Sequence, residues 1–148
     1  MRIEKRFMEY ALEEAKKAGA RGETPVGAVV MRGEEIVSRA GNEVESTRSA
    51  CRHAELLALS RAAEALDKRE LSDCVLYVTM EPCPMCAGAC LNYRIGAVAF
   101  GAYDERCGAL GSKTDILSGE FGRETPVVGG VMREECASLL TDFFKDKR

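Results

Sequence analysis

One segment near the middle of the chain restricts the fold more than any other. Residues 74–80 (CVLYVTM) form a continuous β-prone run, and Pro82 and Pro84 end it abruptly. A continuous apolar run of this kind is typical of a strand that is buried on both faces of a sheet. Pro84 also suits the first turn of a helix, so a helix is predicted to follow the strand directly. We therefore expect a sheet with a layer of helices on each side.

The rest of the chain alternates between the two kinds of element. Apolar residues at helical spacing predict helices, and short β-prone runs bounded by turn residues predict strands. In chain order these are helix 3–18, hairpin strands 26–31 and 36–40, loop 41–51, helix 53–66, strand 95–100, loop 101–122 with room for one short helix, strand 127–131 and helix 133–147. The expected class is α/β, a three-layer α/β/α sandwich with a mixed central sheet of about five strands.

Length and charge narrow the class of protein. The chain has 148 residues, of which 46% are hydrophobic and 30% charged, so we expect one globular domain over residues 1–148. No apolar run is long enough to cross a membrane, and the charged N-terminus lacks the apolar stretch of a signal peptide. A cytoplasmic protein without a membrane partner is expected. The net charge of −3 argues against a generally basic coat for nucleic acid.

Cysteine is unusually frequent for such a chain. The total of 7 is odd, so the cysteines cannot all pair with one another, and in a reducing compartment clustered cysteines indicate metal or redox chemistry before disulfides. Those outside any metal-ligand spacing are expected to be small buried apolar residues: Cys74, Cys107 and Cys136, and with them Cys51 and Cys90.

Two short segments carry the chemistry, and each lies at the predicted start of a helix. They are residues 53–55 (HAE) and 82–86 (PCPMC). The spacing of Cys83 and Cys86 lets both sulfurs face one point, and the partial positive charge of a helix start favours the thiolates that bind metal. His53, the one histidine of the chain, would supply a third ligand to zinc.

Three protein ligands leave the fourth position on zinc open to water, which marks a catalytic rather than a structural site. Zinc lowers the pKa of such a water to about 7. Glu55 would then carry the proton. Because Glu55 stands two residues after His53, the two do not share a face of a regular helix, so the metal must lie beyond the helix end.

Three other interpretations use the same residues. A closed structural zinc site would take its fourth thiolate from Cys51 or Cys90. A thioredoxin-type redox pair would use the two cysteines of residues 82–86, and it leaves the His-x-Glu segment unexplained. Alternatively, His53 is a hydrogen-bonded core histidine and Glu55 is a solvated helix charge.

His-x-Glu combined with Pro-Cys-x-x-Cys is the signature of the zinc nucleobase deaminases. Over nearly its whole length the chain also resembles the bacterial tRNA-specific adenosine deaminases, which are cytidine deaminase-like zinc enzymes. The stretches that carry the resemblance are 24–30, 42, 53–55, 76–88, 94–95, 100–102, 104, 108–112, 135–136 and 139–145.

The resemblance implies a role for each matching residue. His53, Cys83 and Cys86 would bind zinc. Glu55 would take a proton from the zinc-bound water and deliver it to the ring nitrogen and then to the departing ammonia. Residues that would contact the substrate are Asn42, the backbone amide of Ala54, Val26 and Asp104. The implied fold is the cytidine deaminase-like α/β/α sandwich, usually a homodimer with its active sites near the interface.

The favoured substrate is the wobble adenosine in the anticodon loop of a tRNA, converted to inosine, because such a base is easily extruded. One alternative is a free nucleobase or nucleoside (guanine, cytosine or an adenine derivative), and another is a non-catalytic zinc-stabilised binding module. Two stretches near the substrate depart from the family pattern: residues 50–52 (ACR) replace Pro-Thr-Ala, and residues 121–126 lack Asn-His. A local basic strip would use Arg48, Arg52, Lys145, Lys147 and Arg148.

Overall fold

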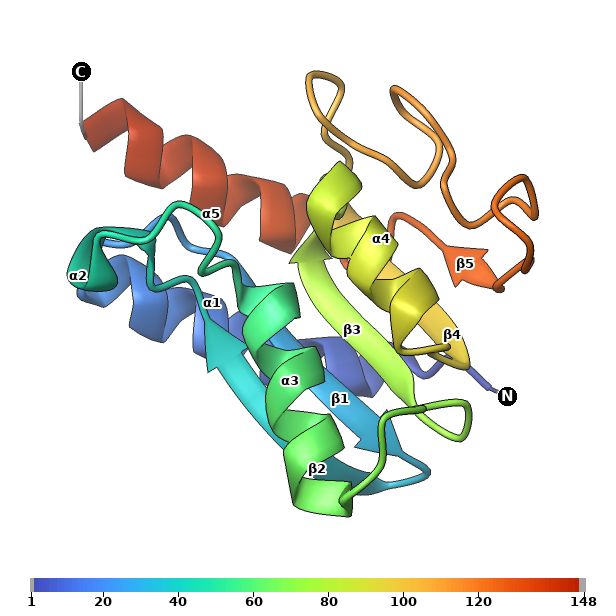
Figure 1. Ribbon diagram of the computed structural model, residues 1–148. Helices are drawn as coiled ribbons and strands as arrows, with labels where there is room; N and C mark the ends of the chain where they lie inside the picture. The colour runs from blue at the N-terminus through green and yellow to red at the C-terminus, as the bar shows by residue number, and fades with distance from the viewer. Residues whose placement is uncertain (1, 147–148) are drawn as a thin grey trace.

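The structure is a computed structural model that describes residues 2–146 (Figure 1). Its elements are α1 (Lys5–Ala20), β1 (Gly27–Arg32), β2 (Glu35–Gly41), α2 (Val44–Thr47), α3 (Ala54–Leu66), β3 (Val75–Met80), α4 (Pro84–Asn92), β4 (Ala97–Ala102), β5 (Val127–Val128) and α5 (Arg133–Asp146). Helices α3 and α4 cover one face of a five-stranded sheet, and α1 and α5 cover the other. The predicted α/β/α sandwich with a mixed sheet is confirmed.

The strand directions bring four strand ends to one edge of the sheet. The strand order is β2-β1-β3-β4-β5, in which β1 is antiparallel to both β2 and β3, whereas β3, β4 and β5 are parallel. The ends of β2, β3 and β4 and the start of β1 therefore lie at the same edge. The segments that leave this edge include residues 81–86 after β3 and residues 103–112 after β4.

The central strand β3 is buried on both faces, as its sequence predicts. Leu76 and Val78 belong to the apolar core beneath α3 and α4. Val75 and Tyr77 belong to the core beneath α1 and α5. Because successive side chains of a strand point to opposite faces, one continuous apolar run supplies both cores.

Two glycines are required by close geometry. At Gly27, where β1 begins, an added Cβ would lie 2.1 Å from the carbonyl oxygen of Ala11, so α1 packs directly on the backbone of the strand. Gly33 has φ 60° in the tight turn between β1 and β2, a conformation that glycine adopts without strain. The close approach at Gly27 fixes where β1 lies under α1.

Three sequence predictions need correction. Residues 41–51 were expected to be a loop, but they contain the one-turn helix α2. The last strand is limited to Val127–Val128, because Gly129 lies against the Phe100 ring and Gly130 has φ 80°. Over residues 103–126, all of which the structure describes, there is no helix.

Cysteine burial also differs in part from expectation. Cys74, Cys90 and Cys136 are buried, but Cys51 and Cys107 are exposed on loops. The expectation used the average burial of cysteine, and it fails where the surrounding backbone lies at the surface. Among the helices described within residues 2–146, none has the length and apolarity needed to cross a membrane.

Candidate active site and metal centre

The starts of α3 and α4 bring three metal-ligand side chains together. His53 immediately precedes α3, Cys83 immediately precedes α4, and Cys86 lies in the first turn of α4. The Nδ1 atom of His53 is 3.7 Å from Sγ of Cys83 and 3.6 Å from Sγ of Cys86. All three ligand atoms lie within 4.8 Å of one another.

These distances match a tetrahedral metal. With metal–sulfur bonds of about 2.3 Å and metal–nitrogen bonds of about 2.0–2.1 Å, the nitrogen–sulfur edge of a tetrahedron is about 3.6 Å. Both nitrogen–sulfur distances agree with that edge. The three residues therefore fit one metal ion with three protein ligands, and their imidazole and thiolate donors are those that zinc accepts.

The two sulfurs interact strongly with each other. A hydrogen bond from Cys86, against the effect of burial and with the help of the nearby His53 ring, lowers the pKa of the Cys83 thiol to about 4. The same hydrogen bond, together with burial, raises the pKa of Cys86. Without a cation, the pair readily accepts one negative charge and resists a second. A bound metal ion would stabilise both thiolates.

The structure supplies no fourth thiolate at this position. Among the described residues, the group of close ligand atoms comprises His53, Cys83 and Cys86. Cys90 is buried one turn further along α4, and Cys51 is exposed on the loop before α3, so neither joins the group. The arrangement leaves a coordination position open, which disfavours the closed structural site. Both sulfurs also lie beside Nδ1 of His53, a contact that a thioredoxin-type redox pair of cysteines would not need.

Glu55 faces the same site from the first turn of α3. Its side chain is buried, with 4% of its surface exposed. Burial raises the pKa of this carboxyl group to about 7, while the positive field of His53 opposes the rise. A carboxyl group with a pKa near the working pH can both accept and return a proton. His53 and Glu55 converge because the chain is extended at His53 and helical from Ala54.

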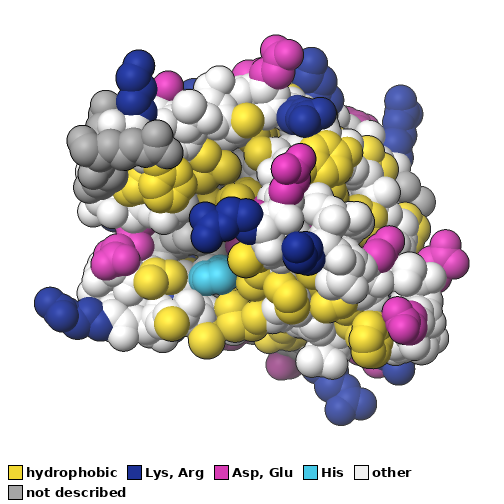
Figure 2. Space-filling view, turned by 90° about the horizontal axis from the view of Figure 1, so that it is seen from above, with side chains coloured by type: hydrophobic (Ala, Val, Ile, Leu, Met, Phe, Trp, Pro, Cys, Tyr) yellow, Lys and Arg dark blue, Asp and Glu magenta, His cyan; other side chains and the backbone are white. Residues whose placement is uncertain are grey.

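A cavity of about 350 Å³ opens over these residues. In Figure 2 the single histidine lies in a hollow with hydrophobic and charged side chains around its mouth. The side chains that line the cavity are Glu23, Thr24, Val26, Asn42, Val44, Glu45, Ala50, His53, Glu55, Met80, Glu81, Cys83 and Asp104. The volume lies in the range of small-molecule sites, so one nucleobase can enter.

The residues expected to contact substrate take different positions. Val26, Asn42 and Asp104 line the cavity. The Ala54 backbone N–H donates a hydrogen bond of 2.8 Å to Oδ1 of Asn42. The Asn42 side chain therefore caps α3, and its NH₂ group is what it can offer to a substrate. Oδ1 of Asp104 accepts hydrogen bonds from the next turn of its own loop. The substrate contacts of these four residues stay predictions.

Two buried glutamates at the cavity were missed by the sequence analysis. Glu23 accepts backbone hydrogen bonds from Glu45 and Ser46 in α2, at 2.9 and 2.7 Å. Glu81 accepts hydrogen bonds from the loop that follows β4. The one sequence signal for these glutamates was their place next to predicted strands, since Glu23 lies just before β1 and Glu81 just after β3. Their partners, however, lie more than 20 residues away.

The expected basic strip is described only in part. Arg48 and Lys145 are exposed, whereas Arg52 is paired with Glu43 at 3.2 Å. Lys147 and Arg148 lie outside the described residues. The basic strip therefore stays a prediction.

Comparison with known proteins identifies similar chains. Residues 1–102 match the model of the cytidine and deoxycytidylate deaminase zinc-binding region. The chain is 43% identical over 143 residues to the tRNA-specific adenosine deaminase of Bacillus subtilis (strain 168), an alignment that covers 96% of this chain and 89% of the relative.

Solved structures are also similar. One comes from studies of A-to-I editing by tRNA:A34 deaminases at the wobble position of transfer RNA, with a TM-score of 0.87, 38% identity and coverage of 93% of this chain and 100% of that one. Another, a guanine deaminase from Nitrosomonas europaea, has a TM-score of 0.84 and 25% identity, covering 97% of this chain and 85% of that one.

Proposed function

This chain belongs to the cytidine and deoxycytidylate deaminase zinc-binding family, and from that premise we propose that it is a zinc-dependent hydrolytic deaminase of tRNA. The reaction is the conversion of adenosine to inosine at the wobble position of the anticodon. The observation that carries the chemistry is the meeting of a buried Glu55 and a His/Cys/Cys ligand group at one open cavity. The substrate is supported by the relatives that act on tRNA adenosine.

Glu55 performs the proton transfers. When bound by His53, Cys83 and Cys86, zinc supplies a Lewis acid that lowers the pKa of a water molecule. Glu55 takes a proton from the water that attacks the carbon bearing the exocyclic amine, and it gives that proton to the adjacent ring nitrogen. It then moves the proton of the new hydroxyl group to the amine. The carbon–nitrogen bond breaks, ammonia leaves and a carbonyl group remains.

The cavity suits a base that has left its stack. It is open to solvent, and an anticodon-loop base needs little energy to be extruded into it. The NH₂ group of Asn42 is held in place because its Oδ1 is occupied by the Ala54 amide. Asn42 can therefore donate hydrogen bonds to an acceptor atom of the base.

A free purine is the second candidate substrate. The structural similarity to a guanine deaminase at 25% identity favours it specifically. The zinc-loaded protein should be incubated separately with an anticodon stem-loop RNA carrying wobble adenosine and with free bases and nucleosides. Inosine formed in the RNA supports the first substrate, whereas turnover of small molecules alone supports the second. Absence of turnover with zinc present would indicate a binding module.

A Glu55 variant tests the chemistry within the same assay. Glu55→Ala is expected to bind stoichiometric zinc, because the three ligands remain, and to lose turnover. Exposed Glu64 lies further along the same helix, so Glu64→Ala serves as the matched control and should keep full activity. An active Glu55→Ala protein would remove Glu55 from the mechanism.

The same proposal extends to assembly and location. We propose that residues 1–148 act as one deaminase domain in a homodimer, for which the exposed Phe121 and Val128 near β5 provide apolar surface. A tRNA substrate supports a cytoplasmic location. Sedimentation equilibrium of the zinc-loaded protein checks the dimer, and a monomer at micromolar concentration would contradict it.

A further inference from the structure

The segment between Asn42 and His53 forms one wall of the cavity. We call residues 43–52 the wall loop. It contains α2, and three of its side chains line the cavity: Val44, Glu45 and Ala50. Its two ends directly join a candidate substrate contact, Asn42, to a metal ligand, His53. The position of this loop therefore affects the shape of the substrate site.

The two ends of the wall loop are tied together at Glu43 and Arg52. The Glu43 backbone N–H donates a hydrogen bond of 3.0 Å to the Arg52 carbonyl oxygen. The Arg52 guanidinium donates a second, of 3.2 Å, to Oε1 of Glu43. A compact loop with adjacent ends is thus closed by a main-chain and a side-chain contact between the same two residues.

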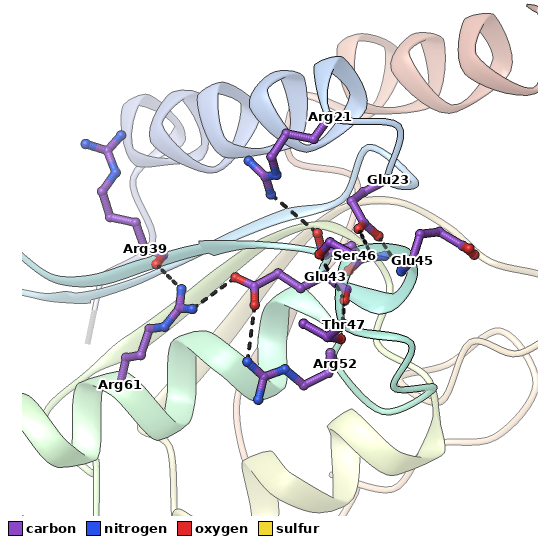
Figure 3. A network of polar contacts seen from close by, with 10 residues as sticks. Arg21, Glu23, Arg39, Glu43, Glu45, Ser46, Thr47, Arg52 and Arg61 are labelled. Carbon is purple, nitrogen blue, oxygen red and sulfur yellow. Dashed lines mark hydrogen bonds and ion pairs between the residues drawn. The ribbon is translucent and has the colours of Figure 1, made fainter.

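A second arginine fixes this closure to α3. Nη2 of Arg61 donates a hydrogen bond of 3.0 Å to Oε2 of Glu43, and Nη1 donates one of 3.1 Å to the Arg39 carbonyl oxygen in β2. Figure 3 shows both arginines directed at the one carboxylate. We call Glu43, Arg52 and Arg61 the Glu43 clamp. It connects β2, the wall loop and α3.

The Glu43 carboxylate is the centre of the clamp. Its side chain has 24% of its surface exposed, against 44% for each arginine. Burial opposes ionisation, but the hydrogen bonds from Arg61 and Arg52 outweigh it and lower the pKa of Glu43. Glu43 is absent from the residues that line the cavity, so it acts on the site through its neighbours.

Helix α2, inside the wall loop, has a separate attachment. Glu23 accepts the backbone N–H groups of Glu45 and Ser46, which holds α2 from the side of β1. Replacing the Glu43 carboxylate therefore leaves the loop attached at α2 and at the backbone hydrogen bond between Glu43 and Arg52, and it removes the two ion pairs with Arg52 and Arg61. The metal ligands on α4 do not depend on these contacts.

We propose that Glu43 is a positioning residue, which acts through Arg52 and Arg61 to hold the wall loop against the substrate cavity. The predicted effect on KM rests on the proposed function, whereas the contacts of the Glu43 clamp do not depend on it. It also gives a role to Arg52, in the stretch of residues 50–52 that departs from the family pattern.

The direction in which KM changes in Glu43→Gln separates a positioning role from a simple charge effect. Glu43→Gln removes a negative charge near a site for a polyanion, so electrostatics alone predict tighter RNA binding and a lower KM. Loss of the clamp predicts a higher KM, because the wall loop no longer keeps the bound shape. Each half-exposed ion pair changes an equilibrium by up to about fivefold, so the expected rise in KM is roughly threefold to tenfold.

The experiment uses the zinc-loaded full chain and an anticodon stem-loop RNA at fixed ionic strength. Glu43→Gln is expected to raise KM, to leave kcat within about twofold and to keep stoichiometric zinc. Glu35→Gln is the matched control: it removes a 3.0 Å ion pair with Arg32 at the opposite end of the hairpin and should change none of these. Arg52→Gln is measured alone and in the double variant Glu43→Gln/Arg52→Gln. The KM of the double variant should be close to the higher of the two single-variant values, because the pair acts as a unit.

Amide hydrogen exchange provides a readout that needs no substrate. In Glu43→Gln, exchange across residues 43–52 should accelerate at least about threefold, whereas α4 should exchange as in the wild type. Unchanged exchange, a KM at or below the wild-type value, a fall in kcat as large as the rise in KM, or loss of zinc would each overturn the proposal. If the wild type deaminates no RNA, the proposed substrate fails, and the exchange measurement still decides whether the clamp holds the loop.

Discussion

Replacing Glu81 with glutamine should destabilise the loop that follows β4. The buried carboxylate accepts backbone hydrogen bonds from Asp104 at 3.1 Å, Leu110 at 3.0 Å and Ser112 at 3.1 Å, and it also bonds the Ser112 hydroxyl. A glutamine can keep its oxygen towards Leu110 and Ser112, and its NH₂ group then faces the Asp104 N–H. One orphaned amide and weaker bonds to the others cost about 2–4 kcal/mol of unfolding free energy.

That cost is measurable by thermal unfolding. For a chain of this size it corresponds to a fall of about 5–15 °C in the unfolding temperature of the zinc-loaded protein. Glu105→Gln, at an exposed position of the same loop, is the control and should unfold like the wild type. Gly108→Ala should also destabilise, since an added Cβ would lie 2.4 Å from the Glu81 carboxyl carbon. An unfolding temperature of Glu81→Gln within 1 °C of the wild type would refute the reasoning.

Two further predictions concern the metal and pH. Elemental analysis should show that Cys83→Ala has lost stoichiometric zinc. Cys90→Ala, which changes a buried cysteine outside the ligand group, should keep its zinc. Zinc retained by Cys83→Ala would show that Cys83 is not a ligand. Glu23→Gln should lower the unfolding free energy at pH 7 by about 1–3 kcal/mol. Burial opposes ionisation of Glu23, yet backbone hydrogen bonds lower its pKa below the ordinary value of a glutamate, so its contribution is present above the ordinary pKa and is lost as the pH falls through the lowered pKa. Urea unfolding of both proteins should therefore converge in acid, and a difference that persists at low pH would contradict this.

The sheet and the centre of the site could be predicted because their signals are local. The continuous run of β3 needs two covered faces, and Pro84 marks the start of α4, so one short stretch predicts three layers. The spacing of Cys83 and Cys86 and the segment that begins at His53 each indicate chemistry at a helix start. What brings them together is the antiparallel pairing of β1 with both β2 and β3, which places the ends of β2 and β3 at the same side of the sheet.

The cavity walls could not be predicted, because long-range hydrogen bonds hold them. Residues 41–51 contain no helix signal that outweighs their polar composition, and α2 exists where Glu23 and Glu43 bind it. Asp104 lines the cavity, where its substrate contact stays a prediction, and its Oδ1 accepts hydrogen bonds from its own loop, which no local sequence signal indicates. Composition alone does not show which glutamates are surface charges and which are buried acceptors of backbone N–H groups.

His53 has a practical consequence because it is the one histidine of the chain. A sample labelled with ¹⁵N at histidine alone will give the ring signals of a single imidazole, and that imidazole lies 3.6 and 3.7 Å from the two sulfurs. Resonance assignment is then unnecessary. Loading, chelation and thiol oxidation can each be followed in solution at the candidate metal centre, without background from the rest of the molecule.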